Sequence, residues 1–537
     1  MEVDNFLQIA SMHRRTGNFQ AAENIYRRIL EDDPDNFRIL NYLGNVLQDQ
    51  RKYEEAMECY QKAVRLNHAF AGSYYHLGSV YEALEQYDRA IHYYEQAAQY
   101  DPHFAGSYNN LGNVYRRLER GDEAIQYFQK AIEVNPKFWG SYYNLGEVLQ
   151  SKVMDDEAIA CYKRVLELNP QHIGTMNNLA LILLERKEIG EALSYCQRAI
   201  HLYPEYGEPH LTRAMILLLM GNLEEGWNEY EWRWKTADAR QWTRNFSEPL
   251  WDGSPLEGKT LLIYPEQGVG DEIMFASCFQ DFINQAEKCI LECDRRLVPL
   301  FTRSFPGTAV IETAGKDQRD QFGMSCFDIG IATGSLPLHF RTALSYFPQT
   351  KSYLIPDPEK VDKWHERFRK LGDGLKVGIS WKGGKDARSR KMRSVDLQKW
   401  RDVFLLEGIS FINLQYGECK EDISKVREEL NVTIHDWEDA DPLRDLDNFA
   451  SAIFALDLVI SVDNATVHMT GALGVPVWTL LTYSPNWRWM LDRGDSPWYP
   501  TMRLFRQPKF GDWESVMIQV GQELRDLQKR GLREKQD

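Results

Sequence analysis

The order of apolar and polar residues divides the chain into two parts with different periods. Up to about residue 239, apolar positions recur in a cycle of 34 residues, whereas from residue 259 short apolar runs alternate with longer amphipathic stretches. A cycle of this length predicts helical hairpins stacked into a superhelix. Apolar runs that alternate with helical stretches predict parallel strands joined by helices. We therefore predict an α-solenoid followed by two doubly wound, Rossmann-like α/β domains.

The repeats of the first part share small residues in fixed places. A ladder of glycines is formed by Gly44, Gly78, Gly112 and Gly146. A small residue lets the two helices of a repeat approach closely, and an aromatic residue of the second helix fills the next groove. The period and pattern are those of the tetratricopeptide repeat. We predict an array over residues 1–239 with six full repeats and a seventh, altered one from residue 205, whose segment GWNEYEWRW docks on the next domain.

Asparagines recur on the predicted first helices and are candidates for binding a polypeptide. An asparagine amide can both donate to and accept from a peptide backbone, and the concave face of such an array suits an extended chain. The alternative is that asparagine before Leu-Gly serves packing between repeats. The candidate acceptor-binding residues are Asn109, Asn110, Asn144, Asn177 and Asn178.

Residues 240–258 are rich in proline and glycine, which predicts a linker. The first α/β domain is expected over residues 259–357, and the second, with a C-terminal helix, over residues 358–537. The strands predicted for the first domain are Thr260–Tyr264, Cys289–Glu292, Ala309–Glu312 and Phe327–Ile331. Those predicted for the second are Val377–Trp381, Ile409–Leu414, Val432–His435, Leu458–Val462 and Val475–Leu481.

The loop PEQGVGD follows the first of these strands and precedes a helix predicted over Glu272–Ile283. Its glycines, Gly268 and Gly270, let the backbone approach a ligand, although they fall short of a dinucleotide fingerprint. Asp271 is predicted at the carboxyl end of a strand, where a carboxylate could accept a proton from an attacking hydroxyl. The equal alternative is an aspartate that only caps the helix.

The segment from Asp457 to Leu481 predicts a strand, a polar turn, a helix of small residues and a second strand. Open α/β sheets bind ligands where a strand gives way to a helix, and helix N-termini attract anions. Candidate phosphate ligands at this turn are Asp463, Asn464, Ala465, Thr466 and His468. The alternatives are that Asp463 and Asn464 cap the helix and that His468 is a packing residue.

Further polar residues are expected at the cleft between the two α/β domains. Lys382 and Arg393 belong to the basic run SWKGGKDARSRKMRS, which is either a solvated loop or an anion clamp, and its position favours the clamp. Gln415 follows the next strand and is a further candidate. Asp439 and Asp441 resemble a metal–diphosphate motif, but their carboxylate-rich surroundings favour a solvated loop. A helix N-terminus with Lys and Arg can stabilise a diphosphate without a metal, so we expect no metal and no cofactor.

Composition narrows the choice of partners. The net charge of -16 argues against a nucleic-acid surface, which needs a basic face. The eight cysteines include no CxxC pair, and the closest two, Cys289 and Cys293, have no histidine nearby in sequence to complete a zinc site. We find no basic-then-apolar signal segment, and the longest apolar run falls far short of the ~20 residues that span a bilayer. The expected compartment is the reducing cytoplasm.

Several segments together resemble a known family. DLVISVDNATVHMTGALGVPVWTLL is similar to the nucleotide-sugar signature of bacterial lipopolysaccharide heptosyltransferases, and GVGD resembles their Gly-Asp element. The combination of these with EGWNEYEWRW, NWRWM and DSPWYPTMRLFRQ resembles a bacterial family of tetratricopeptide proteins with a heptosyltransferase-like GT-B domain. That family includes flagellin-modifying glycosyltransferases. The resemblance covers nearly the whole chain.

The resemblance implies an inverting, metal-independent transfer from a nucleotide-activated sugar. It implies that Asp271 is the general base, that Asp463 contacts the sugar, and that Lys382 and Arg393 neutralise the leaving group. The donor phosphates would be held by Asn464, Ala465, Thr466 and His468. Asn464 and Ala465 stand where heptosyltransferases usually have Thr-Gly, and Arg393 stands where they usually have lysine, so heptose is not assumed as the donor sugar.

We therefore expect a cytoplasmic protein glycosyltransferase whose array recruits a protein acceptor, flagellin being one candidate, for transfer to a Ser or Thr hydroxyl. One alternative is the same chemistry on a glycan or lipid acceptor. Another is a non-catalytic scaffold. O-GlcNAc transferase shares the order of repeats before two α/β domains, so N-acetylglucosamine is a possible donor sugar, and a homodimer of the array also stays open.

Overall fold

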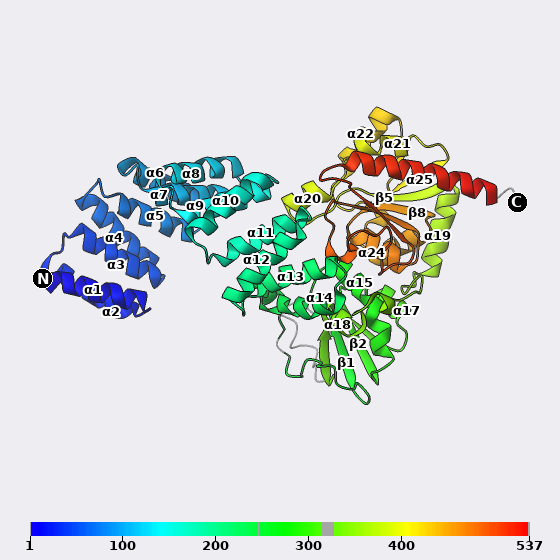
Figure 1. Cartoon of the computed structure of the whole chain (residues 1–537), viewed down its shortest axis with the longest axis horizontal. Helices are drawn as coiled ribbons and strands as arrows, with labels where there is room; N and C mark the ends of the chain where they lie inside the picture. The colour runs from blue at the N-terminus through cyan, green and yellow to red at the C-terminus, as the bar shows by residue number, and fades with distance from the viewer. Residues whose placement is uncertain (1, 245, 314–326, 535–537) are drawn as a thin grey trace. The chain divides into compact units, whose positions relative to one another are not determined.

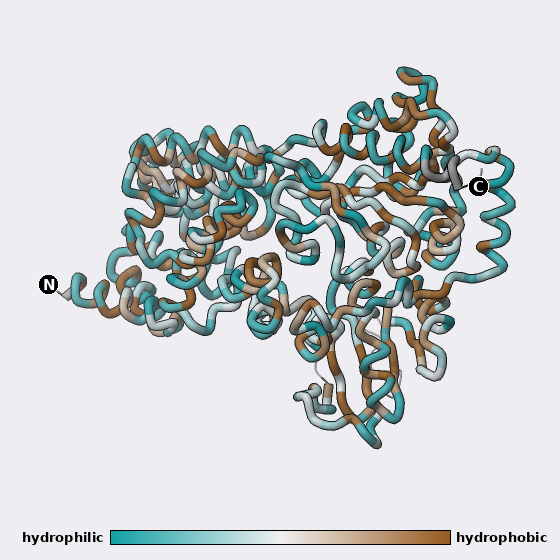
Figure 2. Tube along the Cα trace, turned by 45° about the vertical axis from the view of Figure 1, so that its right-hand side comes forward, coloured by the Kyte–Doolittle hydropathy of each residue, from teal (hydrophilic) through white to brown (hydrophobic). Residues whose placement is uncertain are grey.

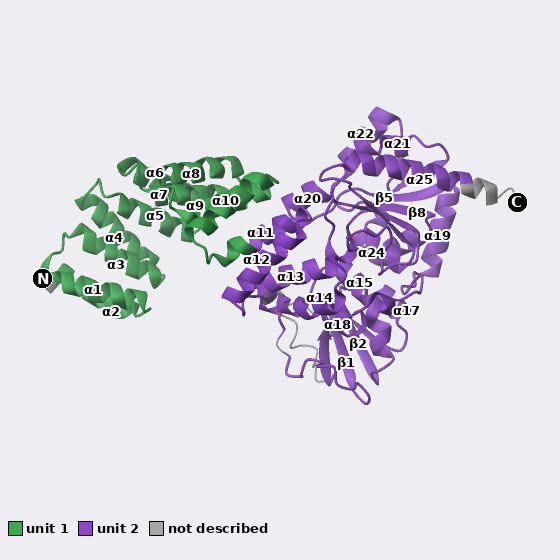
Figure 3. Cartoon of the chain, in the orientation of Figure 1, with its two compact units in different colours: residues 1–176 green, residues 177–537 purple. Residues whose placement is uncertain are grey.

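The computed structural model describes residues 2–244, 246–313 and 327–534 (Figure 1). The chain forms two compact units, residues 1–176 and residues 177–537 (Figure 3). The units divide earlier in the chain than residue 239, where the sequence places the end of the array. The physical reason is that the last helical pairs share a hydrophobic core with the α/β part.

The first unit is built from helical hairpins, as the repeat period predicts. Close approach of the helices requires glycine, because a Cβ on Gly112 would lie 2.5 Å from the ring of Phe128, and one on Gly44 would lie 2.5 Å from Tyr60. Its helices are α1 (Glu2–Arg15), α2 (Phe19–Asp32), α3 (Phe37–Asp49), α4 (Tyr53–Leu66), α5 (Ala71–Ala83), α6 (Tyr87–Tyr100), α7 (Ala105–Arg117), α8 (Gly121–Val134), α9 (Trp139–Ser151) and α10 (Asp155–Leu168).

The turns inside the hairpins also repeat, which the sequence analysis did not detect. In the first and last hairpins the turn holds a glycine with positive φ, Gly17 and Gly221. The turns between them use non-glycine residues with positive φ, namely Arg51, Glu85, Glu119, Val153 and Lys187. Val153, with φ 65°, is strained because a β-branched side chain disfavours the left-handed region.

Four helices of the repeat pattern belong largely to the second unit: α11 (Ile173–Glu185), α12 (Ile189–Leu202), α13 (Gly207–Leu219) and α14 (Leu223–Tyr230). The short helices η1 (Glu231–Lys235) and η2 (Ala237–Gln241) follow. Trp227 of α14 is fully buried, its indole N–H donates to the carbonyl of Arg341 (3.0 Å), and its ring meets Trp487 edge to face. This is the docking contact that the aromatic segment predicts.

The first α/β sheet is parallel, with strand order β3-β2-β1-β4 among the described residues. Its strands are β1 (Thr260–Tyr264), β2 (Lys288–Cys293), β3 (Ala309–Glu312) and β4 (Ile329–Ala332). Its helices are α15 (Val269–Phe275), α16 (Phe279–Ile283), α17 (Val298–Ser304) and α18 (Leu336–Phe340). Figure 2 shows the apolar character of these strands, and β1 is buried almost throughout.

The second sheet is also parallel and has the order β10-β9-β8-β5-β6-β7 in the described part of the chain. Its strands are β5 (Leu375–Ser380), β6 (Ile409–Asn413), β7 (Ile434–His435), β8 (Leu458–Val462), β9 (Val477–Leu481) and β10 (Met502–Arg506). Its helices are α19 (Pro358–Arg369), α20 (Ala387–Arg393), α21 (Arg401–Phe404), α22 (Lys420–Leu430), α23 (Leu446–Phe454), α24 (Ala465–Ala472) and α25 (Trp513–Glu534). The chain reverses its direction of winding between β5 and β8, and such a switch point is where open α/β sheets bind ligands.

Most predicted strands are present, and three elements differ. The helix predicted over Glu272–Ile283 is broken into α15 and α16 by a 3-10 turn, and α15 begins early enough to include Asp271. The basic run contains helix α20 rather than being a loop throughout. Strand β10 had no counterpart in the prediction.

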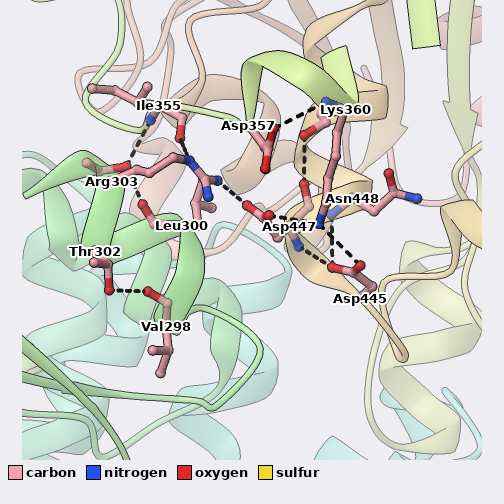
Figure 4. Close-up of polar contacts among 12 residues, drawn as sticks. Val298, Leu300, Thr302, Arg303, Ile355, Asp357, Lys360, Asp445, Asp447 and Asn448 are labelled. Carbon is pink, nitrogen blue, oxygen red and sulfur yellow. Dashed lines mark hydrogen bonds and ion pairs between the residues drawn. The ribbon is translucent and has the colours of Figure 1, made fainter. Parts of the chain in front are cut away.

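An ion cluster joins the two α/β sheets (Figure 4). Asp447 of α23, with only 4 % of its side chain exposed, pairs with Arg303 of α17 and with Lys360 of α19 (2.9 Å). Asp357 caps the start of α19, and Asp445 caps α23. The carboxylate of Asp447 therefore ties the second sheet both to the first and to the connecting helix.

Candidate functional site

The turn after β8 lies against the end of β5, at the switch point. The amide nitrogen of Asn464 donates to Ser380 Oγ (2.7 Å) and to the carbonyl of Lys382 (3.1 Å), while its oxygen accepts from the N–H of Thr466 (3.0 Å). The side chain of Asn464 therefore caps α24 and joins two strand ends, as the capping alternative has it.

Gln415 has a similar internal role. Its side-chain oxygen accepts from the backbone N–H groups of Trp381 (3.0 Å) and Lys382 (2.8 Å) and from Ser380 Oγ (3.0 Å). Its amide nitrogen donates to the carbonyl of Tyr416 (3.0 Å). Gln415 thus shapes the loop after β5, because these bonds hold the loop backbone in place.

The first turns of α15 and α24 touch each other. A Cβ on Gly270 would lie 3.5 Å from Cα of Ala465 and 3.4 Å from Cδ2 of His468. Glycine at position 270 therefore lets two helix N-termini, one from each sheet, meet at one place. Both termini present partly positive backbone N–H groups, which favour an anion between or beside them.

Asp271 lies in this first turn and has two partners. Its Oδ2 accepts from the N–H of Gly268 (3.2 Å), and its Oδ1 pairs with Arg488. The bond from Gly268 is the contact that the capping alternative describes. The ion pair with Arg488 is a second contact, which the sequence did not predict. The segment NWRWM, which contains Arg488, was noticed only as part of the family resemblance.

Arg488 is a buried cation beside Asp271. Burial opposes its charge, but the carboxylate of Asp271, together with Tyr230 and Asp463, outweighs this effect and raises the pKa of Arg488. Its Nη1 donates to Asn486 (2.7 Å), and its guanidinium lies 4.3 Å from the ring centre of Trp487. Its Nε is buried with no hydrogen-bond partner among the described residues. A guanidinium held in this way fixes the position of the Asp271 carboxylate.

His468 is a neutral, buried base. Burial, helped by the charge of Arg488, lowers the pKa of His468 to about 4. Its Nδ1 lies 2.9 Å from the hydroxyl of Tyr499, and its ring stacks on Trp489. At neutral pH it can offer a ligand a hydrogen bond but no charge. The hydroxyl of Thr466, two residues earlier, is buried without a partner among the described residues.

The basic run places Lys382 away from the turn after β8 and Arg393 beside that turn. Lys382 turns towards α22, where its ammonium contacts Asp422 (2.5 Å) and the carbonyl of Glu418 (3.2 Å). Arg393 does face the turn after β8, with its Nη1 3.6 Å from Asp463 Oδ2. The ammonium of Lys385 lies 3.6 Å from the place that a Cβ on Gly268 would take, so it reaches the N-terminus of α15.

Sequence reasoning overlooked Lys385, although a signal was present. Gly383 and Gly384 come directly before it, and Gly384 has φ 95°. A Cβ on Gly384 would also lie 2.5 Å from the backbone of α20. The glycine pair therefore allows the sharp turn that carries Lys385 across to the first sheet.

The loop that carries Asp271 is anchored by a second buried pair. Arg233 of η1 makes two parallel hydrogen bonds to Glu266, at 3.0 and 3.1 Å, and donates to Ser335 Oγ (2.7 Å). Burial raises the pKa of Glu266, and Arg233 opposes that rise. A Cβ on Gly334 would lie 2.0 Å from Glu266, so glycine is required beside it. The final segment of the array thus helps to position the candidate site.

The asparagines of the array mostly link one repeat to the next. Asn109 accepts from Ser141 Oγ (3.1 Å) and from Asn144 Nδ2 (3.0 Å), and Asn177 accepts from Thr212 Oγ1 (2.8 Å). Asn110 donates to the hydroxyls of two tyrosines. Asn178 lies beside Asn177 on α11. The packing alternative thus describes these contacts, and peptide binding stays a prediction.

Two cavities lie near the site in the second unit. The larger, about 290 Å³, has walls from α11, α13, α20 and the segment 482–487. The smaller, about 180 Å³, is at the carboxyl ends of β6 and β7 and is lined by Tyr416, Asp436 and Trp437, among others. Asp439, at its edge, is paired with Arg367 at 2.8 and 2.9 Å.

No cluster of three or more His, Cys, Asp or Glu side chains in the described ranges is arranged to hold a metal ion. Among the helices of the same ranges, none combines the length and the apolar character needed to cross a membrane.

Models of the tetratricopeptide repeat match the N-terminal part of the chain, at residues 71–104, 105–138 and 140–172. Related repeat models match residues 3–46, 49–85 and 172–203. The prediction of a tetratricopeptide array is therefore confirmed.

Among curated proteins, the chain is similar to "Protein FlbA" of Caulobacter vibrioides, with 37% identity over 327 residues. The match covers 59% of this chain and 54% of that protein, so it spans about half the length of this relative.

Two solved structures resemble part of the chain. MamA is 31% identical, with 30% of this chain and 95% of that chain covered and a TM-score of 0.27. YrrB, described as a TPR protein with an unusual peptide-binding site, is 25% identical. The match covers 35% of this chain and 97% of YrrB, with a TM-score of 0.30. From its repeat matches, the chain carries a tetratricopeptide-repeat array between residues 3 and 203, followed by two parallel α/β sheets, and it is similar to Protein FlbA.

Proposed function

We propose that the chain is a glycosyltransferase of the GT-B type, which moves a sugar from a nucleotide-sugar to a Ser or Thr hydroxyl of a protein. The observation that carries the proposal is the meeting of α15 and α24 at Gly270 and Ala465. It puts a carboxylate, Asp271, beside a helix N-terminus at the switch point of a parallel sheet. In this proposal Asp271 accepts the proton on one side of the anomeric carbon, and the N-terminus of α24 holds the phosphate on the other side.

The donor would lie along the second sheet. Its diphosphate fits the N-terminus of α24, where the helix dipole favours an anion and the hydroxyl of Thr466 has no partner among the described residues. Arg393 and Lys385 would supply positive charge from the second sheet's side. The nucleoside fits the cavity of about 180 Å³ at the ends of β6 and β7, close to Trp437.

In the proposed reaction, the acceptor hydroxyl attacks the anomeric carbon while its proton moves to Asp271. The bond from that carbon to the phosphate oxygen breaks, and the nucleotide leaves with the bonding electrons. One displacement from the opposite face inverts the anomeric centre. Charge on the departing phosphate is stabilised by α24 and the nearby cations, so the step requires no metal ion.

The tetratricopeptide array supports a protein as the acceptor, because stacked hairpins offer an extended surface suited to polypeptide. Flagellin, which the sequence resemblance implies, is the first acceptor to test. A glycan or lipid acceptor, and a scaffold without activity, are the outcomes that would replace this proposal.

Calorimetry of the full chain with UDP-, GDP-, ADP- and CMP-sugars, with and without EDTA, tests the donor. We expect one nucleotide to bind equally well in both conditions. Binding that EDTA abolishes would contradict the metal-free mechanism, and binding of none would favour the scaffold.

The base is tested with Asp271→Ala, which should lower turnover by ~10²–10⁴-fold and leave donor binding largely intact. Asp357→Ala is the matched control. Asp357 also caps a helix, α19, but it belongs to the ion cluster of Figure 4 and not to the candidate site. The control should keep its turnover. Retained turnover in Asp271→Ala would remove Asp271 from the mechanism.

A further inference from the structure

The cavity of about 290 Å³ lies where the last repeats meet the α/β part of the second unit. One wall comes from the first helices of two repeats, with Leu181 and Leu184 of α11 and Met215 and Leu219 of α13. The opposite wall comes from α20 and from Trp487. The lining thus combines an apolar surface of the array with groups that border the candidate site.

The walls are held in place by specific contacts. Arg388 of α20 pairs with Glu185 of α11. Ser484 Oγ donates to the carbonyl of Leu184 (2.7 Å), and the N–H of Leu491 donates to the carbonyl of Leu219 (2.9 Å). Because these bonds tie α20 and the segment 482–491 to the array, the cavity is a formed feature of the fold.

Two lining residues connect the cavity to the candidate aspartates. Arg393 borders the cavity and contacts Asp463, and Asn486 borders it and contacts Arg488, the partner of Asp271. An extended peptide advances by about 3.3–3.6 Å per residue. A side chain in the cavity and a hydroxyl at Asp271 can therefore belong to neighbouring residues of one chain.

Size and chemistry restrict what the cavity holds. Its volume of about 290 Å³ leaves room for a single large side chain. Charged and polar residues of α20 and the segment 482–486 also border the cavity, but the four apolar residues of the array wall and Trp487 form a surface on which an apolar side chain can pack. This wall of the cavity is formed by the first helices of the repeats. The same helices carry the recurring asparagines, of which Asn177 is one.

We propose that this cavity is an acceptor subsite, which receives an apolar side chain next to the Ser or Thr that is to be modified. The inference rests on the proposed function for the identity of the reaction, but it makes its own claim about which polypeptides bind. The last two repeats then select the acceptor sequence, and the array does more than recruit.

The test uses the full chain and fluorescently labelled synthetic peptides with one central serine, whose neighbouring residue is alanine, aspartate, leucine or phenylalanine. Binding is measured by fluorescence anisotropy. Burying a leucine side chain should strengthen binding about tenfold or more over alanine. Met215→Trp fills the cavity and should abolish that preference. Met220→Trp, a matched change at an exposed position at the end of α13, should keep it.

A second variant distinguishes the loss of the cavity from a folding defect in Met215→Trp. Met215→Ala enlarges the cavity and should shift the preference from leucine to phenylalanine. Equal binding of the alanine and leucine peptides by the unaltered chain would overturn the proposal, as would an unchanged preference in both Met215 variants.

The nucleotide titration separates this inference from the proposed function. Nucleotide binding that persists in Met215→Trp while peptide selection is lost supports the subsite. Peptide selection by a chain that binds no nucleotide would overturn the glycosyltransferase and leave a peptide-binding cavity.

Discussion

The helical hairpins of residues 2–168 and those of residues 173–230 follow one repeat pattern but have different neighbours. In the first unit, the buried core is made by the hairpins alone, both within one hairpin, as with Tyr60 under Gly44, and between neighbouring hairpins. In the second unit, α13 and α14 share one core with both α/β sheets through Trp227 and Leu218. The same repeat thus builds a self-contained array in one place and part of a candidate site in another.

The difference teaches that sequence similarity between repeats does not imply equal roles. Polar contacts show this most clearly. Arg27 in the first unit pairs with Glu23 and Glu55 while about half of its side chain is exposed. Arg233 in the second is buried and holds Glu266, which begins the loop that carries Asp271.

The largest expected effect is the loss of the buried pair. Arg233→Met should cost about 3–5 kcal/mol of unfolding free energy, because it leaves the carboxylate of Glu266 buried without a partner. Arg27→Met, the matched change at an exposed pair, should cost less than about 1 kcal/mol. Urea unfolding can be followed by tryptophan fluorescence for residues 177–537, which hold all of the 15 tryptophans except Trp139. Far-UV circular dichroism follows the helices of both units. Equal costs for the two variants would remove the distinction between the units.

The two units should respond alike to acid. Burial lowers the pKa of His76 in the first unit and of His468 in the second to about 4, against about 6.5 in an unfolded chain. Between these values the unfolded state binds more protons, so stability falls as the pH drops from 6.5 towards 4, by up to about 3 kcal/mol for each histidine.

Substitution separates the two contributions to this pH dependence. His76→Gln should flatten the pH dependence of the first unit's unfolding and His468→Gln that of the second unit. Unfolding midpoints measured at several pH values between 4 and 7 provide the check. A slope unchanged in both variants would show that other groups cause the acid sensitivity.

Glycine positions provide a smaller contrast. Gly112→Ala in the first unit should cost about 1–3 kcal/mol, because its Cβ would meet the ring of Phe128 at 2.5 Å. Gly190→Ala in α12 of the second unit meets nothing within 4 Å and should stabilise its helix by about 0.5–1 kcal/mol. Differential scanning calorimetry of both variants measures the opposite signs. A destabilised Gly190→Ala would contradict the open space beside that residue.

The smallest effect concerns the turns within the hairpins. Val153→Gly should relieve the strain of a β-branched residue at φ 65° and stabilise the first unit by about 1 kcal/mol. Gly221→Val makes the reverse change at the equivalent turn of the second unit, where φ is 83°, and should destabilise it by about 1–2 kcal/mol. Thermal unfolding of the two variants gives the comparison, and shifts of the same sign would argue against backbone strain as the cause.

Much of the fold could be read from the sequence because it depends on local periodicity. The 34-residue ladders predict the hairpins, and short apolar runs predict nine of the strands in the described residues, among them β1 and β8. Strand β10 was missed because charged residues, Arg503 and Arg506, interrupt its apolar run. Helix α20 within the basic run has no counterpart in the prediction, although its capping box, Asp386 with Ser389, is a local signal for a helix start.

The candidate site was only partly predictable. Asp271, Asp463 and Thr466 follow from their places after strands, since the ends of parallel strands meet at one edge of a sheet. Arg488 lies 217 residues from Asp271 in the sequence, and nothing local marks it as a partner. Lys382 and Lys385 are three positions apart, and their different directions depend on the backbone of Gly384 and on Asp422 in another helix.

The sequence by itself determined the type of most elements, the period of the repeats and many of the polar residues at strand ends, because these depend on the spacing of residues within one segment. The tertiary structure alone decided which repeats join the α/β part, that Arg233 and Glu266 form a buried pair, and that a cavity opens between α11, α13 and α20. These features arise where distant segments pack together, and the energy of such packing depends on neighbours that no local pattern specifies.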